Sequence, residues 1–357
     1  MIPYIEILDK YTRKPFDIVE PSEFWCELKY YGVGEFGIYA TVSKRTLASL
    51  KNGNYIKIPH KPYLWVIEKV EKTFDTDKGL MIYATGRQAK AILSKRIIIS
   101  QTQLATDLTT AVSNLINNNA GAGAITARRI AGLTQAASLV VQPITETQVS
   151  YDNLLTYTDN LLQAYECGSE MTIDGTNLSY RIYKGNDKSD DVIFSQMFDN
   201  LLSSTYSLAE SNYKNFALIG GQGEGNARIT DTFANEAKTG IDLCEIFVDA
   251  KDISSKYTDA NGVEKELDLS NAADLATYKS WLRERGKLKL ADYIRIETFE
   301  GDIDTTNNAY VFGDDYYLGD KVRVQDNRLG VYITPRIVKY TINLTADEYV
   351  EKIEYGE

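Results

Sequence analysis

The sequence predicts a β-rich α+β fold in which two small antiparallel β-domains flank a central α+β domain. Short β-prone runs separated by glycines occupy both ends of the 357-residue chain, and helical periodicity is concentrated in its middle. Tyrosine, which favours strands, occurs 25 times against 11 phenylalanines. A chain of this length exceeds one ordinary core. We place its domains at residues 1–96, 97–190 and 191–357, the last with a helical insertion near 250–290.

The first domain, residues 1–96, contains five β-prone runs at residues 24–30, 36–40, 55–58, 64–70 and 80–83. The polar segment 75–79 ends in glycine and predicts a hairpin turn between the last two runs. Five or six strands with tight turns are typical of a small barrel or sandwich, so we expect one of these two folds.

The central segment, residues 97–190, combines helices with a hairpin. Apolar side chains recur at helical spacing over residues 104–116, and residues 88–95, just before this segment, are also a helix candidate. A further helix spans residues 154–165, with Ser150 as a candidate N-cap and Gly168 as a candidate stop. Residues 171–183 predict a hairpin around the turn at 174–177.

The last segment, residues 191–357, returns to strands, with candidates at residues 216–219 and 241–248. One helix interrupts them, and its apolar side carries Leu275, Tyr278, Trp281 and Leu282. The polar stretch 256–262 predicts a loop. After residue 286 we expect strands to the end of the chain.

Two stretches of the sequence form a weak repeat. Residues 53–58 and 319–324 share the pattern Gly-x-x-aliphatic-basic-aliphatic, and a long hairpin follows each of them. Duplication and chance both remain open, because alternating strands resemble one another easily. If the repeat is real, the inward-facing aliphatic residues are Ile56 and Ile58 or Val322 and Val324, and Lys57 and Arg323 face outward.

Composition narrows the functional classes. The net charge of −11 argues against wrapping of nucleic acid, which needs a basic surface. The three cysteines, Cys26, Cys167 and Cys244, form no CxxC pair, and no stretch is apolar enough for a membrane span. The N-terminus lacks the features of a signal peptide. The tyrosine bias fits either a multi-subunit protein or a tyrosine-rich monomeric core.

The usual catalytic patterns are missing, so we expect no catalytic, cofactor-binding or metal-binding residues. The single histidine, His60, lies in a turn, and residues 220–225 lack both the GxGxxG and the Walker patterns. Residues 259–262 resemble only the start of a calcium loop. Acidic pairs at Asp190-Asp191, Asp314-Asp315 and Glu354 with Glu357 leave a glycosidase or muramidase open.

Short motifs occur along the chain at residues 86–98, 183–189, 194–201, 215–225, 245–252, 285–291 and 317–322. Together, and in this order, they resemble the motifs of the tail hub proteins of long, non-contractile-tailed phages of Gram-positive bacteria. The family corresponds to the N-terminal hub module of tail-associated lysins and is similar to the baseplate hub of contractile phages. Lys188 and Lys251 stand where arginine is expected, which keeps the charge. The motif positions are Gly86, Arg87, Arg96, Gly185, Asp187, Ser189, Asn200, Gly220, Gly221, Glu245, Asp249, Arg285, Gly286, Gly319 and Asp320.

The resemblance implies a non-enzymatic virion protein at the tail tip, made in the cytoplasm of the host bacterium. Two tube-like β-barrel domains per chain would form a homotrimeric, pseudo-sixfold ring. The expected partners are other copies of the chain, a distal tail or tail tube protein, the tape-measure protein, and tip or receptor-binding proteins. DNA would pass through the ring without specific binding. We expect no lytic domain after residue 357. A cell-wall hydrolase with paired carboxylates and a receptor-binding tail protein with an aromatic saccharide pocket are the alternatives.

Overall fold

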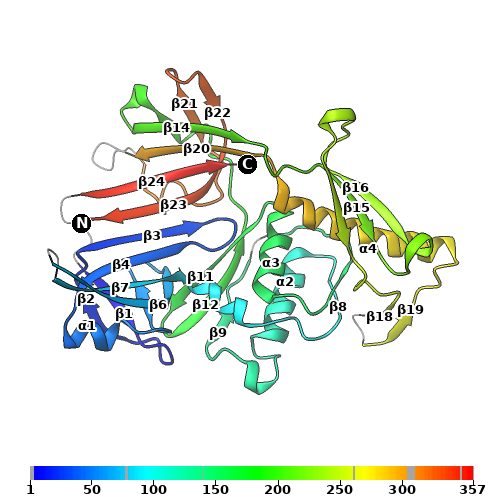
Figure 1. Cartoon of the computed structure of the whole chain (residues 1–357), viewed down its shortest axis with the longest axis horizontal. Coiled ribbons are helices and arrows are strands. Elements are labelled where there is room, and N and C mark those ends of the chain that lie inside the picture. The colour runs from blue at the N-terminus through cyan, green and yellow to red at the C-terminus, as the bar shows by residue number, and fades with distance from the viewer. Residues whose placement is uncertain are drawn as a thin grey trace.

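The computed structural model describes residues 4–76, 79–138, 140–259, 262–303, 310–345 and 348–356, and they form the expected β-rich α+β fold. Figure 1 shows three regions side by side. A large sheet is built from both ends of the chain, a central region surrounds α2 (Leu108–Asn119) and α3 (Leu154–Gln163), and a peripheral region contains α4 (Ala272–Leu290). Within these residues, no helix combines the length and the apolar character needed to cross a membrane.

The large sheet joins the strands of both predicted β-domains. Its order is β14 (Leu201–Ala209), β20 (Ile296–Ile303), β24 (Tyr349–Gly356), β23 (Arg336–Leu344), β3 (Glu23–Lys29), β4 (Glu35–Thr41), β7 (Gly79–Gln88), β6 (Leu64–Asp75), β5 (Tyr55–Lys57), β1 (Ile5–Leu8) and β2 (Pro15–Val19).

This sheet corrects the expectation of two separate barrels. Among the described residues no closed barrel is found, because β23 pairs antiparallel with β3 and so joins the two sets of strands edge to edge. The expected hairpin between β6 and β7 is present, with Asp75 opposite Gly79. Asp77 and Lys78 of its turn lie outside the described residues.

One face of the sheet lies on the largest hydrophobic core of the protein. Burial alternates along the strands, so that Phe24, Cys26 and Leu28 of β3 belong to this core. A three-stranded sheet of β13 (Ile193–Ser195), β21 (Arg323–Asp326) and β22 (Val331–Ile333) contributes Phe194 and Val324 to the same core. The core of the central region covers the opposite face at Tyr55, Leu64 and Val66. We call the rest of that face, which neither core covers, the open face of the sheet.

The repeat is visible in the backbone. The strand orders β3-β4-β7-β6 and β14-β20-β24-β23 are the same, taken in chain order within each half. Gly53 N–H donates to Ile67 O at 2.7 Å, and Gly319 N–H donates to Ile337 O at 2.7 Å. Both glycines have a positive φ, +93° and +89°. A bulge follows Ile67 in β6 and Ile337 in β23. Chance similarity of strand patterns does not produce this shared geometry.

Side-chain directions in the repeated strands confirm the sequence prediction. Ile56, Ile58, Val322 and Val324 are at most 3% exposed. Lys57 faces outward and pairs with Glu6, and Arg323 pairs with Asp190.

The central region has its own core, formed mainly by α2, α3 and the hairpin of β11 (Gly168–Asp174) and β12 (Asn177–Tyr183). Two expectations about α3 are corrected. Its N-cap is Asn153, whose side chain accepts from the N–H groups of Leu155 and Thr156, rather than Ser150. Gly168 begins β11 instead of ending the helix. Residues 88–95 are helical as a 3₁₀ turn, η1 (Ala89–Lys95).

The peripheral region packs a three-stranded sheet on α4. The strands are β16 (Thr230–Ala234), β15 (Phe216–Gly220) and β17 (Glu245–Asp249). Tyr278, Trp281 and Leu282 of α4 are buried against it, and Leu275 is half-buried. The strand expected from residue 241 begins only at Glu245, because residues 240–242 form a 3₁₀ turn.

Short elements complete the chain. They are α1 (Lys44–Ser49), β8 (Thr102–Gln103), η2 (Thr126–Arg128), β9 (Leu133–Gln135), β10 (Gln148–Val149), η3 (Gln196–Phe198), η4 (Gly225–Ala227), η5 (Gly240–Asp242), β18 (Lys256–Thr258), β19 (Glu264–Glu266) and η6 (Ala291–Tyr293). The expected loop at 256–262 begins with β18, which pairs antiparallel with β19, and Ala260 and Asn261 lie outside the described residues.

Candidate assembly surface

The place where the two repeats meet inside one chain is buried on its core side. β3 and β23 pair over six residues, from Lys29 opposite Lys339 to Phe24 opposite Leu344. Cys26 and Ile342 face each other in the core with exposures of 1% and 7%. Burial raises the pKa of the Cys26 thiol, which keeps it neutral. We call this contact the sealed junction.

The repeat relates the strands of the sealed junction to two edges that lack a partner strand. β14 occupies the position of β3, and β6 occupies that of β23. In the part of the chain that the structure describes, β14 pairs only with β20. β5 covers only residues 64–66 of β6, so residues 69–75 have a strand on one side alone. We call β14 and residues 69–75 of β6 the open edges.

Apolar side chains are exposed at both open edges. On β14, Leu202, Tyr206 and Leu208 are 61%, 40% and 50% exposed. At the end of β6, Phe74 is 72% exposed. Tyr206 lies opposite Phe299, which is in the core, so this side of β14 continues the buried face of the sheet. Unpaired strand edges that carry apolar groups are typical of interaction surfaces.

The open face of the sheet carries paired charges. Four basic residues on it each contact a glutamate: Lys29 with Glu27 at 3.3 Å, Lys69 with Glu71 at 2.7 Å, Arg87 with Glu68 at 2.6 Å, and Lys339 with Glu354. Serine and threonine continue this face on β14, where Thr205 lies opposite Glu300. The charges of the open face are therefore paired, and the stacked rings of Tyr39 and Tyr83 lie among them.

Three of the family-motif positions lie at one chain crossing. A Cβ atom on Gly185 would lie 1.9 Å from the carbonyl of Gly319, so this close contact requires glycine at position 185. The buried Asp320 carboxylate accepts from Asn186 N–H at 2.7 Å and from Tyr317 N–H at 2.9 Å. Burial raises the pKa of the neighbouring Tyr30 to about 12, and Tyr30 Oη accepts from Gly185 N–H.

A second set of motif positions builds the peripheral region. Gly286 lets α4 approach β15, because a Cβ atom there would lie 2.7 Å from Ile219 Cδ1. A Cβ atom on Gly221 would lie 2.6 Å from Tyr278 Oη, and Gly220 lies against the Arg228 guanidinium. Arg228 also forms an ion pair with Asp249 at 2.5 Å.

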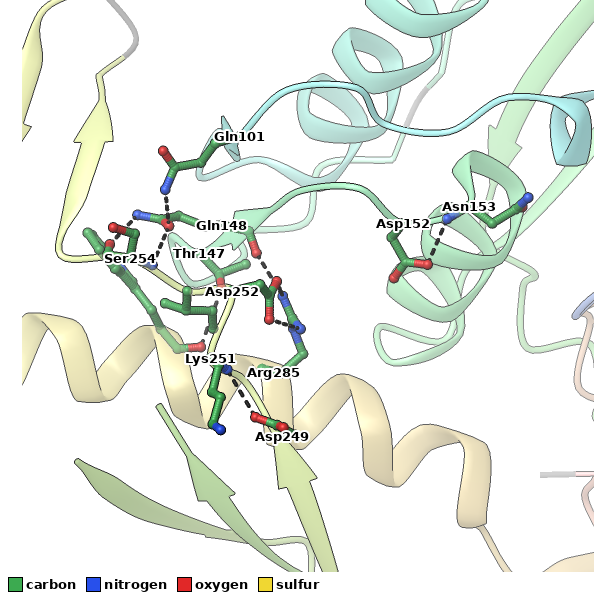
Figure 2. A network of polar contacts seen from close by, with 12 residues as sticks. Gln101, Thr147, Gln148, Asp152, Asn153, Asp249, Lys251, Asp252, Ser254 and Arg285 are labelled. Atoms are coloured by element: carbon green, nitrogen blue, oxygen red, sulfur yellow. Dashed lines mark hydrogen bonds and ion pairs between the residues drawn. The ribbon is translucent and has the colours of Figure 1, made fainter. Parts of the chain in front are cut away.

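Figure 2 shows the polar network that joins the peripheral region to the central one. Arg285 donates to both carboxylate oxygens of Asp252, at 3.0 and 2.8 Å, and to Gln148 O at 3.3 Å. The Gln148 side-chain amide donates to Ser254 O at 2.9 Å and accepts from Ser254 N–H at 3.0 Å. Gln101 donates to Gln148 Oε1 at 2.7 Å. Hydrogen bonds therefore form much of the contact between the peripheral and central regions.

The remaining motif positions are dispersed. A Cβ atom on Gly86 would lie 1.8 Å from Val66 O, and the buried Asn200 side chain bridges Ser195 N–H and Ile193 O. The others are Arg87 on the open face, Arg96 donating to Arg128 O, Asp187 accepting from Ser189, and the exposed Glu245. Some motif positions thus meet where chain segments cross and the others are scattered, so the set does not converge on one chemical site.

Sequence reasoning missed β14, one of the two open edges. Its signal is an alternation in which Leu202, Tyr206 and Leu208 recur at even positions between serines and threonine. Because serines interrupt the apolar residues, this alternation is too weak to predict a strand by itself.

The candidate catalytic groups do not assemble. His60 is exposed in a turn with φ of +62°, and residues 220–225 connect two strands. Asp190 pairs with Arg323, and Asp259 pairs with Lys265. Glu357 of the last acidic pair lies outside the described residues. Those residues contain no group of three or more metal-ligating side chains.

A groove of about 1,200 Å³ is lined in part by Tyr63, Tyr183 and Tyr317. The rings pack on one another, since Tyr317 lies 6.5 Å from Tyr63 and 5.7 Å from Tyr183 between centroids. Glu170 in this groove accepts from Tyr317 Oη at 2.7 Å and pairs with Arg181 at 2.6 Å.

Comparison with known proteins places these features in a family context. The sequence matches the model of the Siphovirus ReqiPepy6 Gp37-like protein family over residues 4–357. The fold is similar to that of a tail protein from Neisseria meningitidis MC58, with a TM-score of 0.58 and 11% identity over 99% of this chain and 96% of that one.

Two prophage proteins have the same fold. The 43 kDa tail protein of prophage MuSo2 from Shewanella oneidensis has a TM-score of 0.56 and 12% identity, over 99% of this chain and 98% of that one. The prophage tail protein gp18 from Listeria monocytogenes EGD-e has a TM-score of 0.51 and 14% identity, over 99% and 94%. No curated protein matches the sequence.

Proposed function

The chain belongs to the Siphovirus ReqiPepy6 Gp37-like family of siphovirus tail proteins, and on that premise we propose that it is the hub at the distal tip of a phage or phage-like tail. In this role three copies form a ring around the tail axis. The ring closes the end of the tail tube and later opens for DNA.

The observation that carries this proposal is the internal repeat. Each chain holds two units with the same strand order, the same bulge and the same positive-φ glycine. Three chains with two such units each supply six similar units around one axis, which matches a sixfold partner while using threefold symmetry. The expected domains 1–96 and 191–357 supply the two units, and domain 97–190 lies between them in sequence.

In this proposal the β-sheets close into a barrel only when three chains assemble. A sheet that is open in one chain leaves two edges for neighbouring chains, and a ring removes both edges at once. The tube-like character expected from the sequence would then arise from three chains together.

The partners follow from the position in the tail. The ring contacts a hexameric distal tail or tail tube protein on one side, receives the end of the tape-measure protein, and can carry tip or receptor-binding proteins. The protein is made in the cytoplasm of the host bacterium and ends in the virion tail. The paired charges of the open face suit a surface that DNA passes without specific binding.

The two alternatives have less support. A cell-wall hydrolase needs two carboxylates free to act across a cleft, whereas Glu170 in the tyrosine-lined groove is held by Arg181 and Tyr317. A saccharide-binding tail protein needs an aromatic ring with a free face, whereas the tyrosines of that groove pack against one another.

The test is an electron-microscopy map of the tail tip, with light scattering on the purified chain. We expect a threefold ring at the tip, and in solution a species about three times the 40.1 kDa chain mass at high concentration. A stable two-fold dimer that buries the large sheet, or a tail tip lacking this chain, would overturn the proposal. Purified protein should leave peptidoglycan intact in a zymogram.

A further inference from the structure

We infer that β6 of one copy pairs antiparallel with β14 of the next copy, in the register that β23 and β3 use inside the chain. The inference rests on the proposed ring and adds the contact that closes it. The partner of each open edge is then the other open edge, on a second copy of this chain.

First, the residues of β6 correspond to those of β23 in the repeat. Ile67 N–H donates to Asn54 O at 2.9 Å, and Ile337 N–H donates to Asp320 O at 2.9 Å. With the glycine hydrogen bonds described above, these contacts make Ile67 the equivalent of Ile337. A bulge follows each residue, so the equivalence continues from Lys69 with Lys339 to Phe74 with Leu344.

The second step aligns β14 with β3 by following the register across each half of the sheet. In the first half, Ile67 lies opposite Gly86, Gly86 opposite Phe36, and Phe36 opposite Cys26. In the second half the corresponding row is Ile337, Tyr355, Phe299 and Tyr206. Cys26 and Tyr206 therefore hold the same position.

The third step transfers the sealed junction to the open edges. Inside the chain, Ile342 lies opposite Cys26, so Lys72 of one copy lies opposite Tyr206 of the next. The full intermolecular register is Lys69 with Ala209, Val70 with Leu208, Glu71 with Ser207, Lys72 with Tyr206, Thr73 with Thr205, and Phe74 with Ser204.

The side chains fit this register. Val70 would lie beside Leu208, and the aliphatic stem of Lys72 would lie beside the Tyr206 ring, which covers exposed apolar surface on the core side. On the open face, Thr73 would meet Thr205. A shift by one residue would turn Val70 and Lys72 of the neighbouring copy away from Tyr206 and Leu208, so the pattern specifies the register.

The experiment is disulfide trapping with the double variant Thr73→Cys and Thr205→Cys, in a Cys244→Ser background that removes the least buried native cysteine. The two positions cannot meet within one chain, because six strands separate β6 from β14 in the sheet, a distance of roughly 30 Å. We expect covalent dimers and trimers on a non-reducing gel after oxidation of tail particles that carry the variant.

The matched control is Thr73→Cys with Ala209→Cys, which lies on the same face but roughly 13 Å along the strand, beyond the reach of a disulfide. Threefold particles in which Thr73 and Thr205 do not crosslink, or in which the control crosslinks equally well, would overturn the register while leaving the ring intact. Particles without a threefold hub would instead overturn the proposed function. The two failures are therefore distinguishable.

Discussion

The sealed junction and the open edges share one backbone plan but carry different side chains. Toward the core, the sealed junction has only apolar or aromatic groups from both strands, Phe24, Cys26, Leu28, Tyr340, Ile342 and Leu344. The open edges have Ser204, Tyr206, Leu208, Val70, Lys72 and Phe74 in the equivalent places. The sealed junction is buried as soon as the chain folds, whereas the open edges stay in contact with water until another chain binds. A lysine and a serine within the apolar stripe limit indiscriminate strand pairing.

The largest expected effect comes from placing a charge in equivalent positions of the two contacts. Ile342→Asp would bury an unpaired carboxylate opposite Cys26 and should lower the free energy of unfolding by at least about 4 kcal/mol. Lys72→Asp, its equivalent on the open edge, should change the stability of the isolated chain by less than about 0.5 kcal/mol. Urea unfolding monitored by tryptophan fluorescence measures both. Equal losses would mean that the open edge is already covered in the monomer.

A smaller effect is expected at the two repeated glycines. Gly319→Ala would place a Cβ atom 2.3 Å from the Tyr30 ring in addition to the positive-φ strain, and should cost about 3 kcal/mol. Gly53→Ala meets only the Lys10 side chain at 3.0 Å, which can move, so the cost should be about 1 kcal/mol. Thermal unfolding of the two variants compares them directly. A Gly53 variant as unstable as the Gly319 variant would contradict this asymmetry.

Asp326 provides a pH-dependent link between β21 and the open edge. Burial alone would raise its pKa, but hydrogen bonds from Ser204 Oγ, Arg328 and the Leu329 N–H outweigh this and hold the pKa at about 2. Because the folded pKa lies below the ordinary value of 3.8, the stabilisation is present above pH 4 and is lost as the pH falls through about 2. Asp326→Asn should cost about 1–2 kcal/mol at pH 7 and flatten the acid limb of the stability profile.

A small effect on the isolated chain is also expected from Leu208→Ala, since this side chain is 50% exposed. We expect a cost of about 0.5 kcal/mol, against about 3 kcal/mol for Leu28→Ala at the equivalent buried position. In assembled particles the order should reverse, with Leu208→Ala reducing ring formation while Leu28→Ala reduces only the amount of folded chain. Light scattering and denaturation on the same samples separate the two.

The fold class and the repeat could be predicted because both depend on local patterns. The spacing from Gly53 to Ile58 recurs from Gly319 to Val324, and the structure gives the two glycines the same positive-φ turn. The joined sheet could not be predicted, because it depends on pairing between β3 and β23 at opposite ends of the chain. Periodicity within a strand says which residues face a core and not which strand lies alongside.

The candidate surface was harder still to predict. The family motifs consist largely of glycines and charged residues. In the structure many of them lie where two chain segments pack closely, as at Gly185. The open edges consist of ordinary strand residues such as Thr73 and Thr205, which carry no distinctive motif. Only the relation between the two halves of the sheet identifies them.

The paired charges of the open face have a consequence for a double helix moving past it. Adhesion of proteins to DNA is driven largely by the release of ions condensed on the phosphates, and this requires free lysines or arginines to replace them. Lys29, Lys69 and Arg87 each already hold a glutamate of the same chain. If this face lines the ring, glutamates of the protein already neutralise these basic side chains. DNA would then pass through the ring with little attraction to its wall and at a rate nearly independent of ionic strength.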